Sequence, residues 1–368
     1  MTFNFKVITI TANRPEWNFV DMAVTMVGAV HVPVYPTLNT DSYVYIFNHC
    51  EANYLFLSNA LQFKRVQPAL NKMENPPMLY SFDPIPGKNY YGDILKLGEE
   101  NREKYQAQLE EIKKSIKSDD LCSMVYTSGT TGDSKGVMLS HRNLTSNFLA
   151  HIKHMPLTQE HKMLSFLPLC HIYERTMNYH YQCKGISIYY AESIGTIADN
   201  MREIQADGFC TVPRVLETIA AKMFSAGKKL PFFARQVYQM AIRHGYKWDY
   251  KGRPWWYGPW QKFFDKTVYS KWRASLGGKH LCIVSGGSAL QQSYIRLFSA
   301  AGIYVYEGYG MTESSPVIAV NNPMTGKCKI GTVGVVLAGT EVKISDEGEI
   351  LTRGPHVMMG YYKDPEYT

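Results

Sequence analysis

The sequence of 368 residues predicts an α/β fold with largely parallel sheets. Short apolar runs that suit buried strands alternate with longer segments of helical spacing, from the N-terminus to about residue 302. Hydrophobic residues make up 45% of the chain and charged residues 19%, which supplies a large core and excludes a disordered or collagen-like protein. Beyond about residue 330 the apolar runs shorten, and the pattern becomes typical of a β-rich subdomain.

The first strand is predicted at Lys6–Thr11 and the helix after it at Pro15–Gly28. The apolar residues of that helix recur at the spacing that places them on one face: Trp17, Val20 and Val24. Further strands are predicted at apolar runs with helical patterns between them: 30–34, 121–126, 164–167, 186–190, 209–212 and 280–285. Strands separated by helices in this way usually pair in parallel.

Three helices carry additional signals. Residues 104–117 are charged and amphipathic, which indicates a helix on the surface. Ser140 can cap the next helix, whose apolar residues repeat every four positions: Leu144, Phe148 and Ile152. A third helix is predicted to begin near Ser288 and to end at Gly302.

Short strands are predicted at 333–336, 341–344 and 349–352, with Asp346-Glu347-Gly348 as a hairpin turn. We therefore expect residues 1–330 to form one α/β region and residues 331–368 to form an incomplete β-rich subdomain.

Composition argues against several classes of protein. No run approaches the ~20 apolar residues of a spanning helix, and the N-terminus has neither the basic start nor the apolar stretch of a signal peptide. The seven cysteines are far apart and form no C-x-x-C pair, which suggests neither a disulfide framework nor a zinc site. We expect a cytoplasmic protein.

The segment 225–280 differs from the rest of the chain. It holds twelve Lys or Arg against two acids, and five of the six tryptophans. Gly and Pro residues divide it into two or three predicted helices. It is either a helical insertion whose aromatic residues pack on the main domain, or a peripheral membrane contact at the inner membrane face.

The segment from Tyr126 to Gly136, Tyr-Thr-Ser-Gly-Thr-Thr-Gly-Asp-Ser-Lys-Gly, follows a predicted strand. Its small and hydroxyl residues let backbone N–H groups surround a phosphate, and Lys135 adds a mobile positive charge. It is not a P-loop, because Ser134 and Gly136 occupy the positions that this motif gives to Gly and to Ser or Thr. A flexible surface loop is the alternative, which the position directly after a buried strand disfavours.

This loop, with Ser140-His141-Arg142-Asn143 after it, resembles the signature loop of the adenylate-forming acyl-CoA synthetases. Other stretches resemble further motifs of that family: Asn13–Trp17, Gly28–Pro36, Leu167–Arg175, Gly286–Ser288, Tyr306–Glu313 and Gly348–Tyr362. The resemblance covers nearly the whole chain. The forms of Leu167–Arg175 and Thr211–Glu217 look most like the long-chain fatty acid branch, although Leu216 stands where some relatives have an aromatic gate.

The resemblance implies roles for individual residues. It assigns ATP to Thr127, Ser128, Gly129, Thr130, Thr131, Gly132, Lys135, Gly286, Gly287, Ser288, Glu307, Gly308, Tyr309, Gly310 and Thr312. It assigns the reaction to Thr127, Lys135, His171, Thr312 and Glu313. ATP and Mg²⁺ are the implied cofactors, with Glu313 as the magnesium ligand and coenzyme A as co-substrate.

The chemistry of these residue types agrees with the roles. ATP must present its α-phosphate to a carboxylate, and because two anions repel, the site needs positive or dipolar groups and a metal. Glu313 suits magnesium, with a surface acid in a turn as the alternative. Tyr309 either stacks on adenine or packs in the core, His171 either binds the acyl carboxylate or is structural, and Arg175 braces the helix that follows.

We therefore expect the large N-terminal portion of a long-chain fatty acid–CoA ligase. The family's ribose-binding aspartate, hinge and small C-terminal domain with its catalytic lysine are not in this sequence, so we expect poor turnover by this portion alone. The alternatives are a ligase for another carboxylic acid and a non-catalytic binder of nucleotide or acyl groups. A nucleic-acid binder is not expected, because it leaves the phosphate loop and Glu313 without a role, and the oligomeric state is not indicated.

Overall fold

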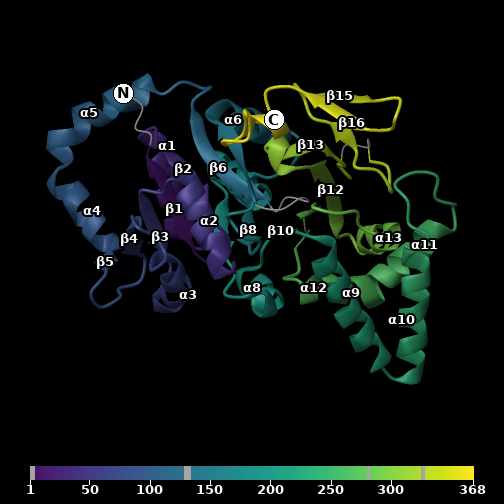
Figure 1. Cartoon of the computed structure of the whole chain (residues 1–368). Helices are drawn as coiled ribbons and strands as arrows, with labels where there is room; N and C mark the ends of the chain where they lie inside the picture. Colours follow the sequence, from purple (N-terminus) through teal and green to yellow (C-terminus); the bar gives the residue numbers. More distant parts are fainter. Residues whose placement is uncertain (1–4, 128–133, 280–281, 325–327) are drawn as a thin grey trace.

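The computed structural model describes residues 5–127, 134–279, 282–324 and 328–368 (Figure 1). The described strands form two large sheets and one small one, and helices pack around them. Both large sheets consist mainly of parallel pairs. The α/β fold with largely parallel sheets is therefore confirmed. No helix in these described ranges is long and apolar enough to cross a bilayer.

The first sheet has the strand order β17-β7-β6-β2-β1-β3-β4-β5 among the described residues. The strands β1 to β6 pair in parallel, whereas β7 and β17 complete one edge in antiparallel pairs. Their bounds are β1 Lys6–Ile10, β2 Val30–Pro33, β3 Tyr54–Leu57, β4 Met78–Ser81, β5 Asn89–Tyr90, β6 Leu121–Thr127, β7 Lys135–Ser140 and β17 Gly360–Tyr361. β6 and β7 thus lead into and out of the phosphate loop that the sequence predicts.

Five helices belong to this first half: α1 Pro15–Met26, α2 Thr40–Cys50, α3 Ala60–Leu70, α4 Tyr91–Glu100 and α5 Arg102–Ser115. Asn39 and Asn59 cap α2 and α3, because each side chain accepts a hydrogen bond from a backbone N–H of the first turn. The predicted charged surface helix is confirmed as α5, which buries none of its residues.

The second sheet has the order β14-β13-β12-β11-β10-β8-β9 within the described residues. Its strands are β8 Lys162–Ser165, β9 Ser187–Tyr190, β10 Gly208–Thr211, β11 Cys282–Ser285, β12 Tyr304–Gly310, β13 Val317–Val320 and β14 Val335–Val336. Its flanking helices include α6 His141–Ile152, α7 Ile172–Lys184, α8 Ile197–Ile204 and α13 Gln292–Ala300. Ser140 caps α6, as the sequence predicts.

The prediction that a helix begins near Ser288 is wrong, because α13 begins at Gln292. The chain between them stays non-helical while Leu290 is buried in the core. The backbone N–H of Leu290 donates a hydrogen bond to Oε1 of Glu307 at 3.3 Å. Burial of Leu290 and this bond to β12 hold the segment against the sheet.

The basic aromatic segment forms the end of α9 Pro213–Lys228, then α10 Phe232–Gly245, α11 Tyr257–Phe264, a π-helical turn Asp265–Tyr269 and α12 Ser270–Ser275. These helices project at the lower right of Figure 1. Their inner residues join the core cluster beside the second sheet. The predicted division into helices is confirmed.

After residue 330 the chain contributes to all three sheets. The strands β15 Glu341–Ile344 and β16 Ile350–Arg353 form the small antiparallel sheet. The turn between them contains Gly348 with φ of +86°, as the predicted hairpin requires. Because β14 joins the second sheet and β17 the first, this segment links both halves, and the domain boundary at residue 330 stays a prediction.

Candidate active site

A cavity of about 330 Å³ lies where β6, β11 and β12 end. In open α/β sheets, ligands bind beyond the carboxyl ends of parallel strands, so this is the expected place for a site. Nine residues that the sequence singles out line it: Thr127, His171, Gly286, Gly287, Gly308, Tyr309, Gly310, Thr312 and Glu313. Residues from positions 127 to 313 of the chain therefore meet around one hollow.

Two of these glycines have a physical reason to be glycine. Gly287 has φ of +82°, in the region where side chains are strained. A Cβ on Gly310 would lie 1.7 Å from the carbonyl oxygen of Pro316, which excludes any side chain there. Both positions keep backbone close to the cavity, where it can approach a ligand.

Three predicted residues do not line the cavity: Lys135, Ser288 and Glu307. Glu307 is buried, and burial raises the pKa of its carboxyl group. Its hydrogen bond from Leu290 gives it a structural task in holding the segment before α13. Ser128 to Gly132, which the resemblance assigns to ATP, lie outside the described residues.

Lys135 begins β7, at the far end of the phosphate loop from Thr127. Its Nζ lies 3.3 Å from the ring centroid of Tyr367 and 5.2 Å from that of Tyr361. The hydroxyl of Tyr361 in turn donates a hydrogen bond to Oε1 of Glu313 at 2.7 Å. The two charged side chains that the sequence assigns to the phosphates are thus joined through one tyrosine.

The donor set suits a magnesium ion that arrives with ATP. Glu313 is the acidic residue of the cavity lining, and no cluster of three or more His, Cys, Asp or Glu in the described ranges could hold a metal by itself. Magnesium usually takes one or two carboxylates and completes its shell with phosphate oxygens and water. One carboxylate oxygen of Glu313 is engaged by Tyr361, which leaves the other for such an ion.

His171 stands at the N-cap of α7. Its Nδ1 accepts a hydrogen bond from the backbone N–H of Tyr173 at 3.2 Å, which places the proton of the neutral ring on Nε2. Desolvation lowers the pKa of His171 from 6.5, so the neutral form prevails at pH 7. The ring therefore offers one N–H donor to an oxygen in the cavity.

Sequence reasoning missed one wall of the cavity. That wall is formed by His151, Met155, Tyr173, Met177, Val317 and Val320. The first two are four residues apart at the end of α6 and just beyond it, and the two from α7 have the same spacing. Such i, i+4 pairs are a usable signal, but they are equally typical of core packing.

A second, larger cavity of about 1120 Å³ runs along α9. Residues every third or fourth position from Val215 to Ala226 line it, a length of about 16 Å at the helical rise. Its volume lies above the ~300–1000 Å³ of most ligand pockets. Apolar side chains from α8, α10 and α12 cover its other sides.

The two cavities adjoin. Val212 lines the larger cavity, and its Cγ1 lies 3.7 Å from where a Cβ of Gly287 would be. Gly287 lines the smaller cavity. One valine side chain and one glycine therefore separate the smaller cavity, which the predicted polar residues line, from the long apolar one.

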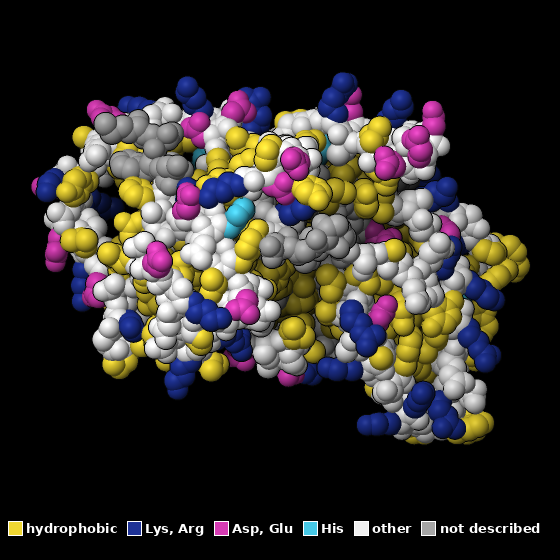
Figure 2. Space-filling model, viewed as in Figure 1, with side chains coloured by type: hydrophobic (Ala, Val, Ile, Leu, Met, Phe, Trp, Pro, Cys, Tyr) yellow, Lys and Arg dark blue, Asp and Glu magenta, His cyan; other side chains and the backbone are white. Residues whose placement is uncertain are grey.

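The larger cavity has basic residues and no acidic residue among those that line it: Arg202, Arg214, Lys222, Lys266 and Lys271. The three lysines have no acidic partner in the part of the chain that the structure describes. Figure 2 shows dark blue and yellow side chains together on the projecting helices at the lower right.

Some aromatic residues of 225–280 lie in the core and others on the surface. Tyr238, Tyr269 and Trp272 are buried in the core. Trp255 and Phe233 are 89% and 82% exposed. Packing therefore accounts for the first group and leaves the second without a structural task.

Comparisons with known proteins agree with this geometry. The sequence model of the AMP-binding enzymes matches residues 5–362. The chain is 30% identical over 394 residues to long-chain-fatty-acid–CoA ligase 5 of Mus musculus, with 97% of this chain and 54% of the relative covered. It is 29% identical over 373 residues to long-chain-fatty-acid–CoA ligase FadD15 of Mycobacterium bovis, with 99% and 60% covered.

Among solved structures, the N-terminal domain of FACL13 from Mycobacterium tuberculosis superposes with a TM-score of 0.69 at 17% identity, covering 99% of this chain and 79% of that one. This likeness shows the shared fold. The chain spans about half the length of the curated relatives that it matches. The match over nearly its whole length shows that the chain belongs to the AMP-binding enzyme family.

Proposed function

We propose that this chain is the ATP- and acid-binding region of a long-chain fatty acid–CoA ligase. The observation that carries the proposal is the apolar cavity along α9, which adjoins the smaller cavity at Val212. The polar groups that line the smaller cavity, among them His171, Thr312 and Glu313, suit the nucleotide and the acid's carboxylate. The apolar extension suits an alkyl chain. The names of the relatives support the same substrate class.

The size of the larger cavity favours a long chain. An extended chain advances about 1.2 Å per bond, since three backbone bonds span ~3.3–3.6 Å. The ~16 Å along α9 therefore accommodates a chain of about 13 bonds. Burial of each methylene contributes about 0.8 kcal/mol, so affinity should rise with chain length until the cavity is full.

The residues of the smaller cavity would then serve adenylation. A carboxylate oxygen of the acid attacks the α-phosphorus of ATP, pyrophosphate leaves, and the thiol of coenzyme A later displaces AMP from the acyl-adenylate. Thr127, Lys135, Thr312 and the loop 128–132 would hold the phosphates. Gly286, Gly287, Ser288 and the segment from Glu307 to Gly310 would border the adenosine.

His171 and Glu313 would have separate tasks. The Nε2–H of His171 would orient a carboxylate or adenylate oxygen, since the ring is neutral and its Nδ1 is occupied. Glu313 would hold magnesium, which supplies positive charge to the phosphates. Both act by positioning and electrostatics, so the protein itself forms no covalent bond to the substrate.

The direct test is a scan of carboxylic acids. The chain, at a concentration above that of ATP, is mixed with magnesium and acids of two to eighteen carbons or aryl acids, and acyl-adenylate is measured by mass spectrometry. We expect product with long-chain acids and a large loss with Lys135→Ala. If only aryl or short acids gave product, the substrate would be an acid of that class and not a long-chain fatty acid. If the chain bound ATP but formed no adenylate with any acid, it would be a non-catalytic binder.

We also propose that segment 225–280 makes a peripheral contact with the inner membrane face. Trp255 and Phe233 are exposed on it, and the unpaired lysines of the larger cavity lie on the same group of helices. Tryptophan favours the headgroup zone and lysine favours anionic lipid. A long-chain acid partitions into bilayers, so this contact would bring the cavity to its substrate.

A further inference from the structure

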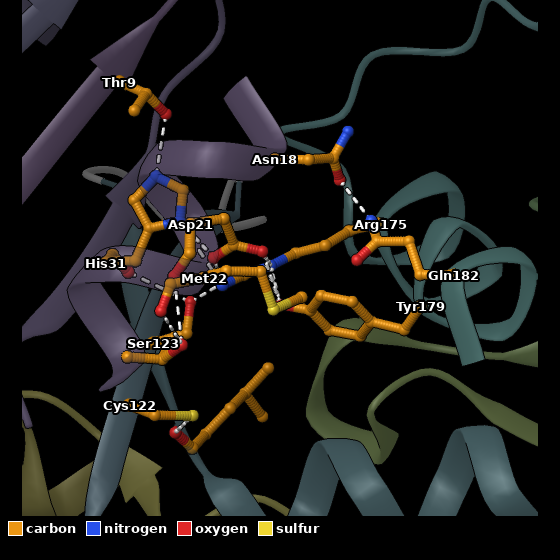
Figure 3. A network of polar contacts seen from close by, with 12 residues as sticks. Thr9, Asn18, Asp21, Met22, His31, Cys122, Ser123, Arg175, Tyr179 and Gln182 are labelled. Carbon is orange, nitrogen blue, oxygen red and sulfur yellow. Dashed lines mark hydrogen bonds and ion pairs between the residues drawn. The ribbon is translucent and has the colours of Figure 1, made fainter. Parts of the chain in front are cut away.

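A fully buried polar network joins the two halves of the molecule away from both cavities (Figure 3). Its centre is Arg175, in the first turn of α7, whose side chain has no exposed surface. The guanidinium donates to Oδ1 of Asp21 at 2.5 Å and to Oδ2 at 3.2 Å, and to Oγ of Ser123 at 2.5 Å. Arg175 thus ties α7 to α1 and to β6.

The network balances its own charge. Asp21 also accepts hydrogen bonds from Nδ1 of His31 at 2.6 Å and from the hydroxyl of Tyr179 at 2.6 Å. Burial opposes the ionised form of Asp21, but Arg175 and His31 outweigh it and hold its pKa below the usual value. Burial lowers the pKa of His31, so the ring is neutral and the pair Asp21–Arg175 carries no net charge.

Two residues of the network, Arg175 and Ser123, lie on elements that also carry residues of the candidate active site. The backbone N–H of Arg175 donates to the carbonyl of His171 at 3.2 Å, so the arginine lies one turn from the ring that faces the cavity. Ser123 lies on β6, four residues before Thr127, where that strand reaches the same cavity. Residues two and four apart on a strand share a face, so the strand transmits the position of Ser123 to Thr127.

We propose that Arg175 is a positioning residue that sets His171 relative to Thr127. The proposal rests on the adenylation role given above to His171. Arg175 touches neither cavity and acts through Asp21 and Ser123 on one side and through its own helical turn on the other. It would hold the acid-orienting ring at the correct distance from the α-phosphate.

Only arginine suits this position. Its planar guanidinium can bond Asp21 through two nitrogens and still reach Ser123 with the third, whereas the single ammonium of lysine is a point charge without that fixed fork. A displacement of about 1 Å between reacting groups can cost ~10²-fold in rate. The arginine is therefore needed for geometry in addition to charge.

The test must separate position from stability. Removal of Arg175 alone would leave Asp21 as a buried unpaired charge, so the paired variant Arg175→Met with Asp21→Asn is used, because replacing both members of a buried ion pair is often neutral for stability. The control is Arg296→Met with Asp249→Asn, a partly exposed ion pair of 2.9 Å whose two residues line neither cavity. Thermal unfolding is measured first, and then adenylate formation in a single turnover.

We expect the paired variant to unfold near the temperature of the parent, to bind ATP with unchanged affinity, and to form adenylate about 10²-fold more slowly. In the background of His171→Ala the same pair should cause little further loss, since both changes remove one function. Additive losses, or a full rate in the stably folded pair, would overturn the proposal.

If the paired variant does not fold, the Arg175→Lys variant tests the positioning role instead. It keeps the charge opposite Asp21 but loses the simultaneous bond to Ser123, so we expect a folded protein with a slowed adenylation rate and unchanged ATP affinity. A rate equal to the parent's would overturn the positioning role. Failure of the proposed function looks different, because the parent chain itself would then yield no adenylate from long-chain acids.

Discussion

Buried polar side chains have hydrogen-bond partners on one face of α7 and lack them on the other. The face that carries Arg175 and Tyr179 meets α1 and β6, where its donors find acceptors on Asp21 and Ser123. The face that carries His180 meets α6, where the rings of His180 and His151 lie 5.3 Å apart. Both ring nitrogens of His180 lack a hydrogen-bond partner within the described structure, and His151 has only the backbone carbonyl of Asn147 close to its ring.

The polar groups on the first face stabilise the fold, whereas those on the second still lack hydrogen-bond partners. A buried polar atom without a partner costs about 1–3 kcal/mol, so a protein rarely keeps one without a use. The satisfied face fixes α7 to the first sheet. The unsatisfied face of α7 meets His151 of α6, which lines the candidate active site, and there a ligand or a water can supply a further partner.

The largest expected effect comes from breaking the satisfied face. Arg175→Met alone should lower the free energy of unfolding by about 3–5 kcal/mol, because it leaves Asp21 charged, buried and unpaired. Urea denaturation followed by circular dichroism measures the loss. Adding Asp21→Asn should recover most of it. An unchanged stability of the single variant would show that Asp21 is protonated or reached by water, contrary to the network described.

The unsatisfied face should make stability depend on pH. Desolvation lowers the pKa of His180 to about 4, against about 6.5 in the unfolded chain. The unfolded state therefore binds more protons between these values, so the contribution of His180 is complete above pH 6.5 and is lost as the pH falls toward 4.

The loss should be about 1.4 kcal/mol per pH unit for this ring, or about 2 kcal/mol between pH 6 and 4.5. Unfolding by urea at several pH values, compared between the parent and His180→Leu, measures it. Parallel pH profiles for the two proteins would mean that the ring is solvated.

The third prediction compares one change on each face at pH 7. His180→Leu should raise the free energy of unfolding by about 1–2 kcal/mol, since it removes two unpartnered atoms. Tyr179→Phe should lower it by a similar amount, since its hydroxyl bonds Asp21. Thermal unfolding of both variants gives the signs. The same sign for both would contradict the contrast between the two faces.

The smallest effect concerns polar groups that are unpaired but exposed. Lys222, Lys266 and Lys271 meet water, so they cost nothing in the folded protein and are free to attract anionic lipid, at about 1 kcal/mol each. Vesicle co-sedimentation should show binding to anionic vesicles at low salt that is lost at high salt. Replacing all three by Gln should halve or abolish it. Equal binding to neutral vesicles would reject the membrane contact.

Sequence patterns predicted the site better than the contacts that support it. The phosphate loop and the motifs around His171, Gly286 and Glu313 can be recognised in the sequence, because each consists of neighbouring residues whose types suit its chemistry. The partners of Arg175 do not, since Asp21 lies 154 residues away in the chain and only the fold brings it near. His151 was missed as a cavity residue because a lone histidine on a helix resembles any core residue.

The fold was predicted unevenly for a related reason. Strands with continuous apolar runs, such as β6 and β11, were recognised, whereas the elements between residues 40 and 100 were not. Asn39 and Asn59 each cap a helix there, but an asparagine is as common in turns as at helix starts. The cavity along α9 follows from tertiary packing, which no local pattern contains.

The acyl chain is proposed to lie in the cavity along α9, and Ile219→Trp would obstruct that cavity without changing a residue of the smaller one. Ile219 lies about 9 Å from the start of α9 and lines this cavity, so a tryptophan there should fill its middle. Calorimetric titration with acids of four, eight, twelve and sixteen carbons measures the affinity of each for the parent and the variant. We expect the affinity for the two longer acids to fall at least tenfold in the variant, which corresponds to about 1.4 kcal/mol. The two shorter acids should bind both proteins with the same affinity. Equal affinity for the sixteen-carbon acid in both proteins would contradict the proposal.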